Sequence, residues 1–160
     1  MFKVLDPGMP LISVYSVVDG TYRNRETIER SEEEWRGLLP SDVFIIARMK
    51  GTEPAFTGKY HACKEPGVYI CACCENDLFL SDDKFDSGTG WPSFTKPVSD
   101  RNILIEEDRS FGMIRDEVLC AVCGAHLGHV FDDGPAPSGR RYCMNSAALR
   151  LRSQSDGFIT

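Results

Sequence analysis

Apolar and polar residues alternate in two stretches near the start of the chain, 12–18 and 20–28, on either side of Asp19-Gly20. Alternation with a period of two is typical of half-buried strands, and Asp-Gly between two such stretches is a strong signal for a β-hairpin. The pattern therefore predicts an N-terminal β-arm over residues 1–30.

A helical pattern replaces this alternation after residue 30. Ser31 precedes Glu34 by three residues at the start of a segment with helical periodicity, which is the pattern of a capping box. Pro40 ends that helix, and Ser41 offers the N-cap of a second one, whose apolar residues recur at helical spacing. We expect a helical segment over residues 31–56.

The rest of the chain consists of short apolar runs separated by Gly, Pro, Asp and Ser. Such spacing is typical of antiparallel β structure. We therefore expect a single domain over residues 1–160 that is mainly β, with its β body at 57–152. The expected strands of this body are 67–70, 77–80, 103–106, 117–119, 129–131 and 142–152.

The composition is that of a globular protein: of 160 residues, 26% are charged and 42% are hydrophobic. The net charge of −6 provides no basic surface for a phosphate backbone, so nucleic acid is not an expected partner. The apolar runs are shorter than the roughly 20 residues that a membrane span needs, and the N-terminus lacks a secretion signal. We expect no membrane contact and a cytoplasmic location.

Four of the seven cysteines form two CxxC pairs, Cys71/Cys74 and Cys120/Cys123, each directly after an apolar run. A strand that delivers one thiolate and a turn that returns the second is the pattern of a zinc knuckle, and two knuckles supply the four ligands of one structural Zn²⁺. Cys73 could replace Cys74 as a ligand. One pair could also be a redox dithiol of the thioredoxin type, although neither opens a helix after a βαβ strand.

Cys143 follows two arginines, Arg140 and Arg141. A nearby cation favours the thiolate, which is the nucleophilic form; the alternative is a buried strand cysteine with a packing role. His126 and His129 follow the second knuckle directly. Beside a thiolate they could donate or orient a proton, and otherwise they would be β-turn histidines or replacement metal ligands.

An aromatic loop at 85–94 lies between the knuckles and contains Trp91. Tryptophan can offer an apolar face to a methyl or thioether group, or it can fill a core beneath a turn. The sequence alone leaves both roles open.

Together these motifs resemble the methionine-R-sulfoxide reductase B family. The resemblance covers roughly residues 30–152. It implies a fold of two coiled antiparallel sheets with a peripheral zinc, and an enzyme that reduces the R epimer of methionine sulfoxide. The segments that carry it are 67–79, 84–94, 120–135 and 141–146, with Trp35, 51–53 and 56–58 upstream.

The resemblance also implies roles for individual residues. Cys143 would be the nucleophile, the two histidines would lie around the sulfoxide oxygen, and Trp91 and Phe94 would bind the substrate, with Trp91 at its methyl group. The residues expected at the catalytic centre are Cys143, His126, His129, Asn145 and Arg141.

The chemistry suits these residue types. Attack of a thiolate on the sulfoxide sulfur requires protonation of the departing oxygen, which an adjacent imidazole can supply. The cysteine is left as a sulfenic acid, which condenses with a second thiol to a disulfide that thioredoxin or a similar dithiol can reduce.

The motifs do not identify the thiol that would form this disulfide with Cys143. One common form of the family carries it in the loop that corresponds to 85–94, at the position where this chain has Thr89. The role then falls to another thiol or to direct attack by a reductant. We expect Cys63 in preference to Cys73, because Pro and Gly close behind Cys63 indicate a mobile loop.

The alternative function is a non-catalytic zinc-knuckle module that grips a peptide or lipid-like partner with Trp91. Such a module does not require Cys143 with its histidines. An enzyme would reduce half of a racemic methionine sulfoxide in the presence of dithiothreitol, whereas a binding module would reduce none. We expect a monomer that acts on free or protein-bound methionine sulfoxide.

Overall fold

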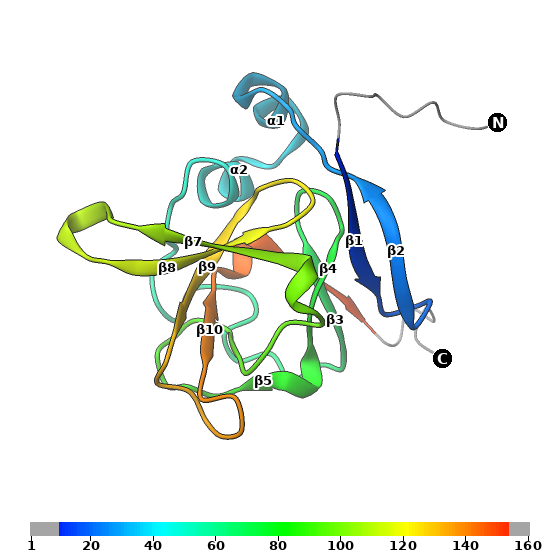
Figure 1. Cartoon of the computed structure of the whole chain (residues 1–160). Helices are drawn as coiled ribbons and strands as arrows, with labels where there is room; N and C mark the ends of the chain where they lie inside the picture. The colour runs from blue at the N-terminus through cyan, green and yellow to red at the C-terminus, as the bar shows by residue number, and fades with distance from the viewer. Residues whose placement is uncertain (1–9, 154–160) are drawn as a thin grey trace.

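The computed structural model describes residues 10–153, which contain two α-helices and eleven β-strands (Figure 1). The expectation of a mainly β fold is confirmed. The helices are α1 (Glu32–Leu38) and α2 (Ser41–Ala47). The strands are β1 (Leu11–Ser16), β2 (Thr21–Glu26), β3 (Gly67–Cys71), β4 (Asp77–Leu80), β5 (Lys84–Phe85), β6 (Ser93–Phe94), β7 (Ile103–Asp108), β8 (Arg115–Cys120), β9 (His126–Phe131), β10 (Arg141–Met144) and β11 (Leu149–Ser153).

The strands pair antiparallel and form three sheets. The largest has the order β5-β6-β10-β9-β8-β7, the second has the order β11-β3-β4, and β1 pairs with β2 alone. The β7–β8 hairpin projects beyond the body on one side, and the β1–β2 arm lies on the other (Figure 1). Pairing of neighbouring strands in the large sheet is what positions the site described below.

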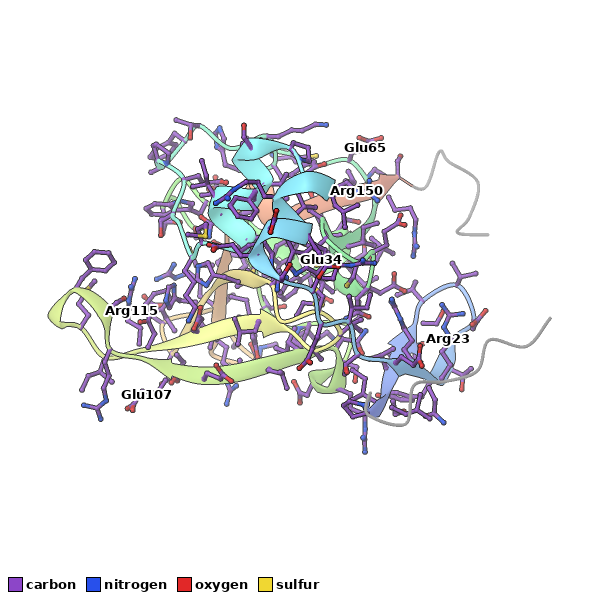
Figure 2. The ribbon with its side chains drawn as sticks, turned by 90° about the horizontal axis from the view of Figure 1, so that it is seen from above. Arg23, Glu34, Glu65, Glu107, Arg115 and Arg150 are labelled. Atoms are coloured by element: carbon purple, nitrogen blue, oxygen red, sulfur yellow. The ribbon has the colours of Figure 1, made fainter. Side chains whose placement is uncertain are left out.

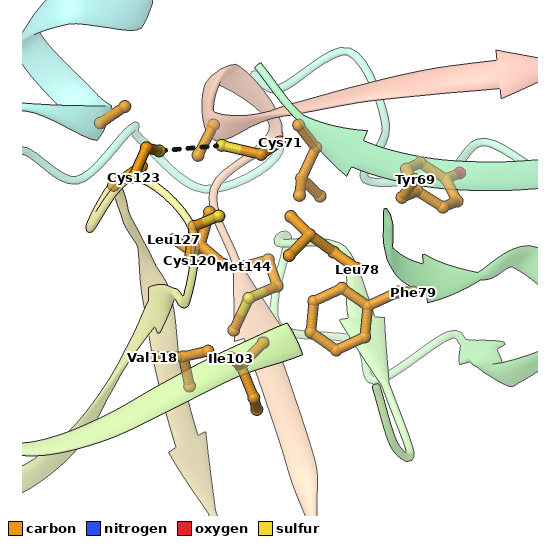
Figure 3. Packing of buried hydrophobic residues seen from close by; sticks show 14 of the residues in the cluster. Tyr69, Cys71, Leu78, Phe79, Ile103, Val118, Cys120, Cys123, Leu127 and Met144 are labelled. Atoms are coloured by element: carbon orange, nitrogen blue, oxygen red, sulfur yellow. Dashed lines mark hydrogen bonds between the residues drawn. The ribbon is translucent and has the colours of Figure 1, made fainter. Parts of the chain in front are cut away.

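The core is rich in aromatic rings. Phe79 of β4 and Phe94 of β6 stack with 4.4 Å between their centroids, and Tyr69 of β3 meets Phe94 edge-on at 5.1 Å. Leu127 and Met144 extend this fully buried cluster (Figure 3). Full burial of a large apolar side chain contributes about 1.5–3 kcal/mol, so the cluster holds the two larger sheets against each other.

The β1–β2 arm is joined to the body through the buried side chain of Asn102. Its Oδ1 accepts a hydrogen bond from Tyr15 N–H at 2.8 Å, and its Nδ2 donates to the carbonyls of Tyr15 at 3.0 Å and Asp77 at 2.8 Å. Gly20, at φ 67°, ends the turn between the two strands. The predicted hairpin is therefore present and is fixed by a buried amide.

The two helices begin differently. Ser31 and Glu34 form the predicted capping box, with both backbone-to-side-chain hydrogen bonds at 3.1 Å. The expected N-cap of α2 is wrong, because Ser41 is already helical and the Pro40 carbonyl accepts the first hydrogen bond, from Phe44 N–H at 2.9 Å. Within residues 10–153 no helix is long and apolar enough to cross a membrane.

The expected strand at 142–152 is two strands in different sheets. β10 ends at Met144 and β11 begins at Leu149. In the 3₁₀ turn between them, the N–H groups of Ser146 and Ala147 donate to the Glu53 carboxylate at 2.9 and 3.0 Å. Because Glu53 lies 93 residues before Ser146, no local feature of the sequence marks this reversal.

Candidate active site and metal centre

The two CxxC pairs meet where two sheets approach each other. β3 ends at Cys71 and β8 ends at Cys120, and a turn after each returns the second cysteine of the pair. The Sγ atoms of Cys71, Cys74, Cys120 and Cys123 lie within 4.8 Å of one another. Figure 3 shows Cys71 and Cys123 facing each other. The four predicted ligands therefore lie together, and Cys73 is not part of the cluster.

The sulfur positions fit a tetrahedral metal site. Four sulfur atoms at about 2.3 Å from one ion lie about 3.8 Å from one another. The Sγ atoms are 3.7 Å apart for Cys71 and Cys123, and 3.5 Å apart for Cys74 and Cys120. These two distances are close to the tetrahedral value, so the four cysteines could together hold a metal ion.

Hydrogen-bond donors surround the same sulfur atoms. The N–H of Cys73 lies 3.4 Å from Cys71 Sγ, Asn76 Nδ2 lies 3.6 Å from Cys120 Sγ, and an Arg48 guanidinium nitrogen lies 3.6 Å from Cys123 Sγ. Donors of this kind stabilise metal-bound thiolates and orient them. Cys73 thus contributes its backbone to the cluster.

Strand register brings the candidate catalytic residues to one face of the large sheet. Cys143 of β10 is paired with His129 of β9 and with Ser93 of β6, and His129 is paired in turn with Glu117 of β8. Directly paired residues share a face, with Cβ atoms about 4.5–5.5 Å apart. The candidate nucleophile and a candidate proton donor are therefore neighbours because of the register.

A cavity of about 190 Å³ opens at Cys143. Its volume suits one side chain, since drug-sized ligands occupy about 300 Å³ or more. Of the residues singled out from the sequence, it brings together Cys143, His129, Arg141, Asn145 and Trp91. The full lining is Thr52, Thr89, Trp91, Arg115, Gly128, His129, Phe131, Arg141, Cys143, Met144 and Asn145.

Two opposing effects act on the Cys143 thiol. Burial raises its pKa, and this outweighs the Arg141 guanidinium and the Thr89 hydroxyl, which lower it. Arg140 is directed to the Tyr142 hydroxyl at 3.5 Å instead. The expected cation effect is thus present for Arg141, but the thiol form predominates at neutral pH.

Arg141 is held rigidly beside Cys143. Its Nε and one terminal nitrogen donate to the two carboxylate oxygens of Asp133 at 2.9 and 3.1 Å. Its guanidinium carbon lies 4.5 Å from the centre of the Phe131 ring. A bidentate pair and a stacking contact on one side chain restrict its rotamers, so a fixed positive charge faces the cavity.

The two histidines have different surroundings. His129 lines the cavity, and its Nε2 lies 2.8 Å from Asp108 Oδ2. This hydrogen bond holds the pKa of Asp108 well below its usual range, so the partner is a carboxylate. His126 lies behind His129, with 5.4 Å between ring centroids, and its Nδ1 is 2.6 Å from Glu117 Oε2.

Burial lowers the pKa of His126, and Glu117 only partly opposes this. His126 is therefore neutral at pH 7. Of the two histidines, only His129 is part of the cavity lining, and a place for both around the sulfoxide oxygen stays a prediction.

Glu53 connects the aromatic wall of the cavity to the end of β10. Its carbonyl accepts a hydrogen bond from Trp91 Nε1 at 2.9 Å, and its N–H donates to Asn145 Oδ1 at 3.1 Å. The Asn145 Nδ2 donates to the Leu127 carbonyl at 3.3 Å. Since both amide atoms of Asn145 bind backbone groups, Asn145 positions the segment next to Cys143.

The expected contact between Phe94 and substrate is corrected by the structure. Phe94 is paired with Tyr142, which neighbours Cys143 on β10, so strand alternation directs it to the opposite face of the sheet. There it stacks on Phe79 and has no exposed surface. Its neighbour Ser93 shares the face of Cys143 instead.

The remaining thiols, Cys63 and Cys73, are both half-buried and lie outside the cavity of Cys143. Cys63 lines a second cavity of about 490 Å³, which has Trp91 in common with the first. Lys84 Nζ donates to the Cys63 carbonyl at 2.9 Å. None of the seven cysteines forms a disulfide in the described structure.

The structure adds residues to which the motifs assign no separate role. Asp108 and Asp133 orient His129 and Arg141, and Glu53 holds two walls of the cavity. Glu53 was visible in the sequence only as part of the segment 51–53 that carries the family resemblance. Strand pairing and a distant turn bring these residues to the site. The spacing of residues along the sequence therefore does not reveal them.

The chain is similar to one family of known proteins over most of its length. Residues 39–153 match the family model described as the SelR domain. The chain is 52% identical over 132 residues to a peptide methionine sulfoxide reductase MsrB of Hahella chejuensis, which covers 82% of this chain and 94% of that protein. It is 54% identical over 132 residues to a protein of the same name from Azotobacter vinelandii, covering 82% and 99%. A Methanosarcina barkeri relative of the same name is 50% identical over 133 residues, covering 83% and 94%.

The metal centre is tested by Cys120→Ser. We expect this variant to lose its bound ion and to melt at a lower temperature, because three thiolates leave the site open and binding of a structural metal contributes to folding free energy. Elemental analysis of the dialysed protein and calorimetry measure both effects. Cys73→Ser is the matched control and should retain the ion. A wild-type protein without tightly bound metal would contradict the assignment.

Proposed function

Because the chain belongs to the SelR domain family, we propose that it reduces the R epimer of methionine sulfoxide, free or in proteins, to methionine. The observation that carries this proposal is the placement of Cys143 beside His129 and Arg141 in a cavity walled by Trp91. Family membership supports the reaction, and this placement supports Cys143 as its nucleophile, His129 as its proton donor and Trp91 as its substrate wall.

In the proposed reaction the methyl group of the substrate lies against Trp91 and its sulfur faces Cys143. The Cys143 sulfur attacks, the sulfur–oxygen bond of the sulfoxide breaks, and the oxygen passes to Cys143 as a sulfenic acid. Two electrons move from the cysteine sulfur to the substrate sulfur, which leaves as the thioether of methionine. Tryptophan suits this position because thioethers contact aromatic rings favourably.

The departing oxygen requires a proton, and two groups of the cavity can provide it. The burial of Cys143 keeps its own proton available before attack, and His129 is oriented by Asp108 to act as the acid. Arg141 stabilises the thiolate once the proton has moved. His126 supports His129 from behind and acts as a positioning residue.

The enzyme must then return Cys143 to the thiol. We propose that Cys63 forms a disulfide with Cys143, which thioredoxin or a similar dithiol reduces. The cavities of the two cysteines are separated by the loop that ends at Trp91. Since a disulfide requires Cα atoms within about 4.4–6.8 Å, this loop has to move after methionine departs.

For the metal we propose one structural Zn²⁺, because four thiolates at tetrahedral spacing suit zinc and leave no open position for catalysis. Its role is to hold the ends of β3 and β8 together. We also propose that the protein is a cytoplasmic monomer. Its seven cysteines form no disulfide in the described structure, which is consistent with a reducing compartment.

The nucleophile is tested by Cys143→Ser with dithiothreitol and racemic N-acetyl-methionine sulfoxide. The wild type should convert half of the substrate and leave the S epimer, whereas the variant should retain less than about one hundredth of the rate, because it lacks the attacking sulfur. Metal content and melting temperature should match the wild type. Chiral chromatography of the remaining sulfoxide reports the epimer, and substantial turnover by the variant would exclude Cys143 as the nucleophile.

Recycling is tested by Cys63→Ser. This variant should form one methionine per enzyme at the normal rate and turn over normally with dithiothreitol, yet slowly with thioredoxin, because Cys143 stops at sulfenic acid. Adding Thr89→Cys should restore thioredoxin turnover, since Thr89 lines the same cavity as Cys143. Normal thioredoxin turnover in Cys63→Ser, or a mapped disulfide between Cys73 and Cys143 in the wild type, would contradict the choice of Cys63.

A further inference from the structure

The tip of the β7–β8 hairpin presents apolar side chains to solvent. Phe111 is 89% exposed, Ile114 is 66% exposed and Met113 is 45% exposed. We call these three residues the hairpin tip. Exposed apolar residues are common singly, but a contiguous group on a projecting loop marks an interaction surface.

The backbone conformation of the hairpin tip is unfavourable for Phe111. Met113 N–H donates to the Ser110 carbonyl at 3.1 Å, and the two residues between them both have positive φ, 56° at Phe111 and 70° at Gly112. This is the pattern of a type I′ turn, whose preferred central pair is Asn-Gly. Phe111 therefore occupies a turn position that favours asparagine. Its ring projects into solvent.

The strand pair next to this loop is part of the catalytic cavity. Arg115, the residue after Ile114, lines the cavity and pairs with Asp108 at 3.4 Å across the hairpin. Asp108 in turn binds His129. Figure 2 shows Arg115 and Glu107 on the two sides of the hairpin, at the end of its strands next to the loop. The apolar tip is thus continuous with the cavity wall.

We propose that the hairpin tip is a docking surface for polypeptide substrates, where it contacts an apolar side chain near the methionine sulfoxide. This inference rests on the proposed function. Phe111 lies four residues from Arg115, which at about 3.3 Å per residue is a span of about 13 Å at most. A substrate chain whose methionine sulfoxide enters the cavity would cover that span with the next three or four residues.

The surface favours unfolded, oxidised protein segments. Large apolar side chains are often buried in folded proteins, so one that lies near a methionine becomes accessible when its segment unfolds. Free methionine sulfoxide is too short to reach the tip. The tip would therefore increase the affinity for polypeptides, while the cavity alone determines the rate on the free amino acid.

The experiment compares two acetylated nonapeptides that carry a central methionine-(R)-sulfoxide in Gly and Ser. One has leucine three residues to each side, and the other has serine there. With dithiothreitol as reductant, we expect the wild type to show a KM about five- to tenfold lower for the leucine peptide, a typical size for one apolar contact at an interface. The kcat should be similar for both peptides.

Phe111→Asn removes the ring and installs the residue that the turn prefers. We expect this variant to lose the preference for the leucine peptide through KM, to keep the wild-type rate on N-acetyl-methionine-(R)-sulfoxide, and to melt at or above the wild-type temperature. A merely structural role of Phe111 would instead lower the melting temperature. Val18→Ser, which changes an exposed apolar residue in the turn of the β1–β2 arm, is the matched control and should keep the preference.

Two outcomes would overturn the inference. One is an unchanged leucine preference in both Phe111→Asn and the double variant Phe111→Asn/Ile114→Ser. The other is a wild-type dimer in sedimentation that these variants dissociate, because the tip would then contact a second copy of the chain. Absence of wild-type activity on N-acetyl-methionine-(R)-sulfoxide would contradict the proposed function itself, so the two failures are distinguishable.

Discussion

The site depends on one buried residue, Glu53, whose side chain and backbone join three segments distant in sequence. The Glu53 side chain accepts hydrogen bonds from two consecutive N–H groups in the turn after β10, while its backbone binds the Asn145 side chain and the Trp91 indole. Hydrogen bonds to a charged group contribute about 1.5–3 kcal/mol each. Gly58 leaves the space for this arrangement, since a Cβ there would collide with Glu53 Oε2. Glu53 therefore fixes both the chain beside Cys143 and the wall opposite it.

Sheet register and the cysteine cluster supply the remaining constraints. Pairing of β9 with β10 sets His129 beside Cys143, and the aromatic core holds the sheet that carries them against β3 and β4. The four clustered cysteines come from the ends of β3 and β8, which belong to different sheets. A metal ion there would lock the two sheets together, and none of its four ligands lines the cavity of Cys143. Stability and catalysis thus use separate thiols of the same chain.

The sequence predicts the features that local spacing encodes. The two knuckles, the capping box at Ser31 and the hairpin arm follow from residues a few positions apart, and all three are present. The family motifs point to the residues around Cys143. Local spacing does not show that Phe94 faces the core, because this depends on its pairing with Tyr142. It also does not show that 142–152 is broken, because the carboxylate that binds the turn at the break comes from Glu53, in a distant segment.

The central claim is that Glu53 holds the cavity in its reactive shape. The most direct measurement is the single-turnover rate of Glu53→Gln on N-acetyl-methionine-(R)-sulfoxide, at a temperature where circular dichroism shows the variant to be folded. Glutamine has the same size, but its amide nitrogen would face one of the two N–H groups that the carboxylate accepts. Since small displacements of catalytic groups cost up to about 100-fold in rate, we expect a rate at least about tenfold below that of the wild type, with the metal retained. A folded Glu53→Gln protein that reacts at the wild-type rate would contradict the account.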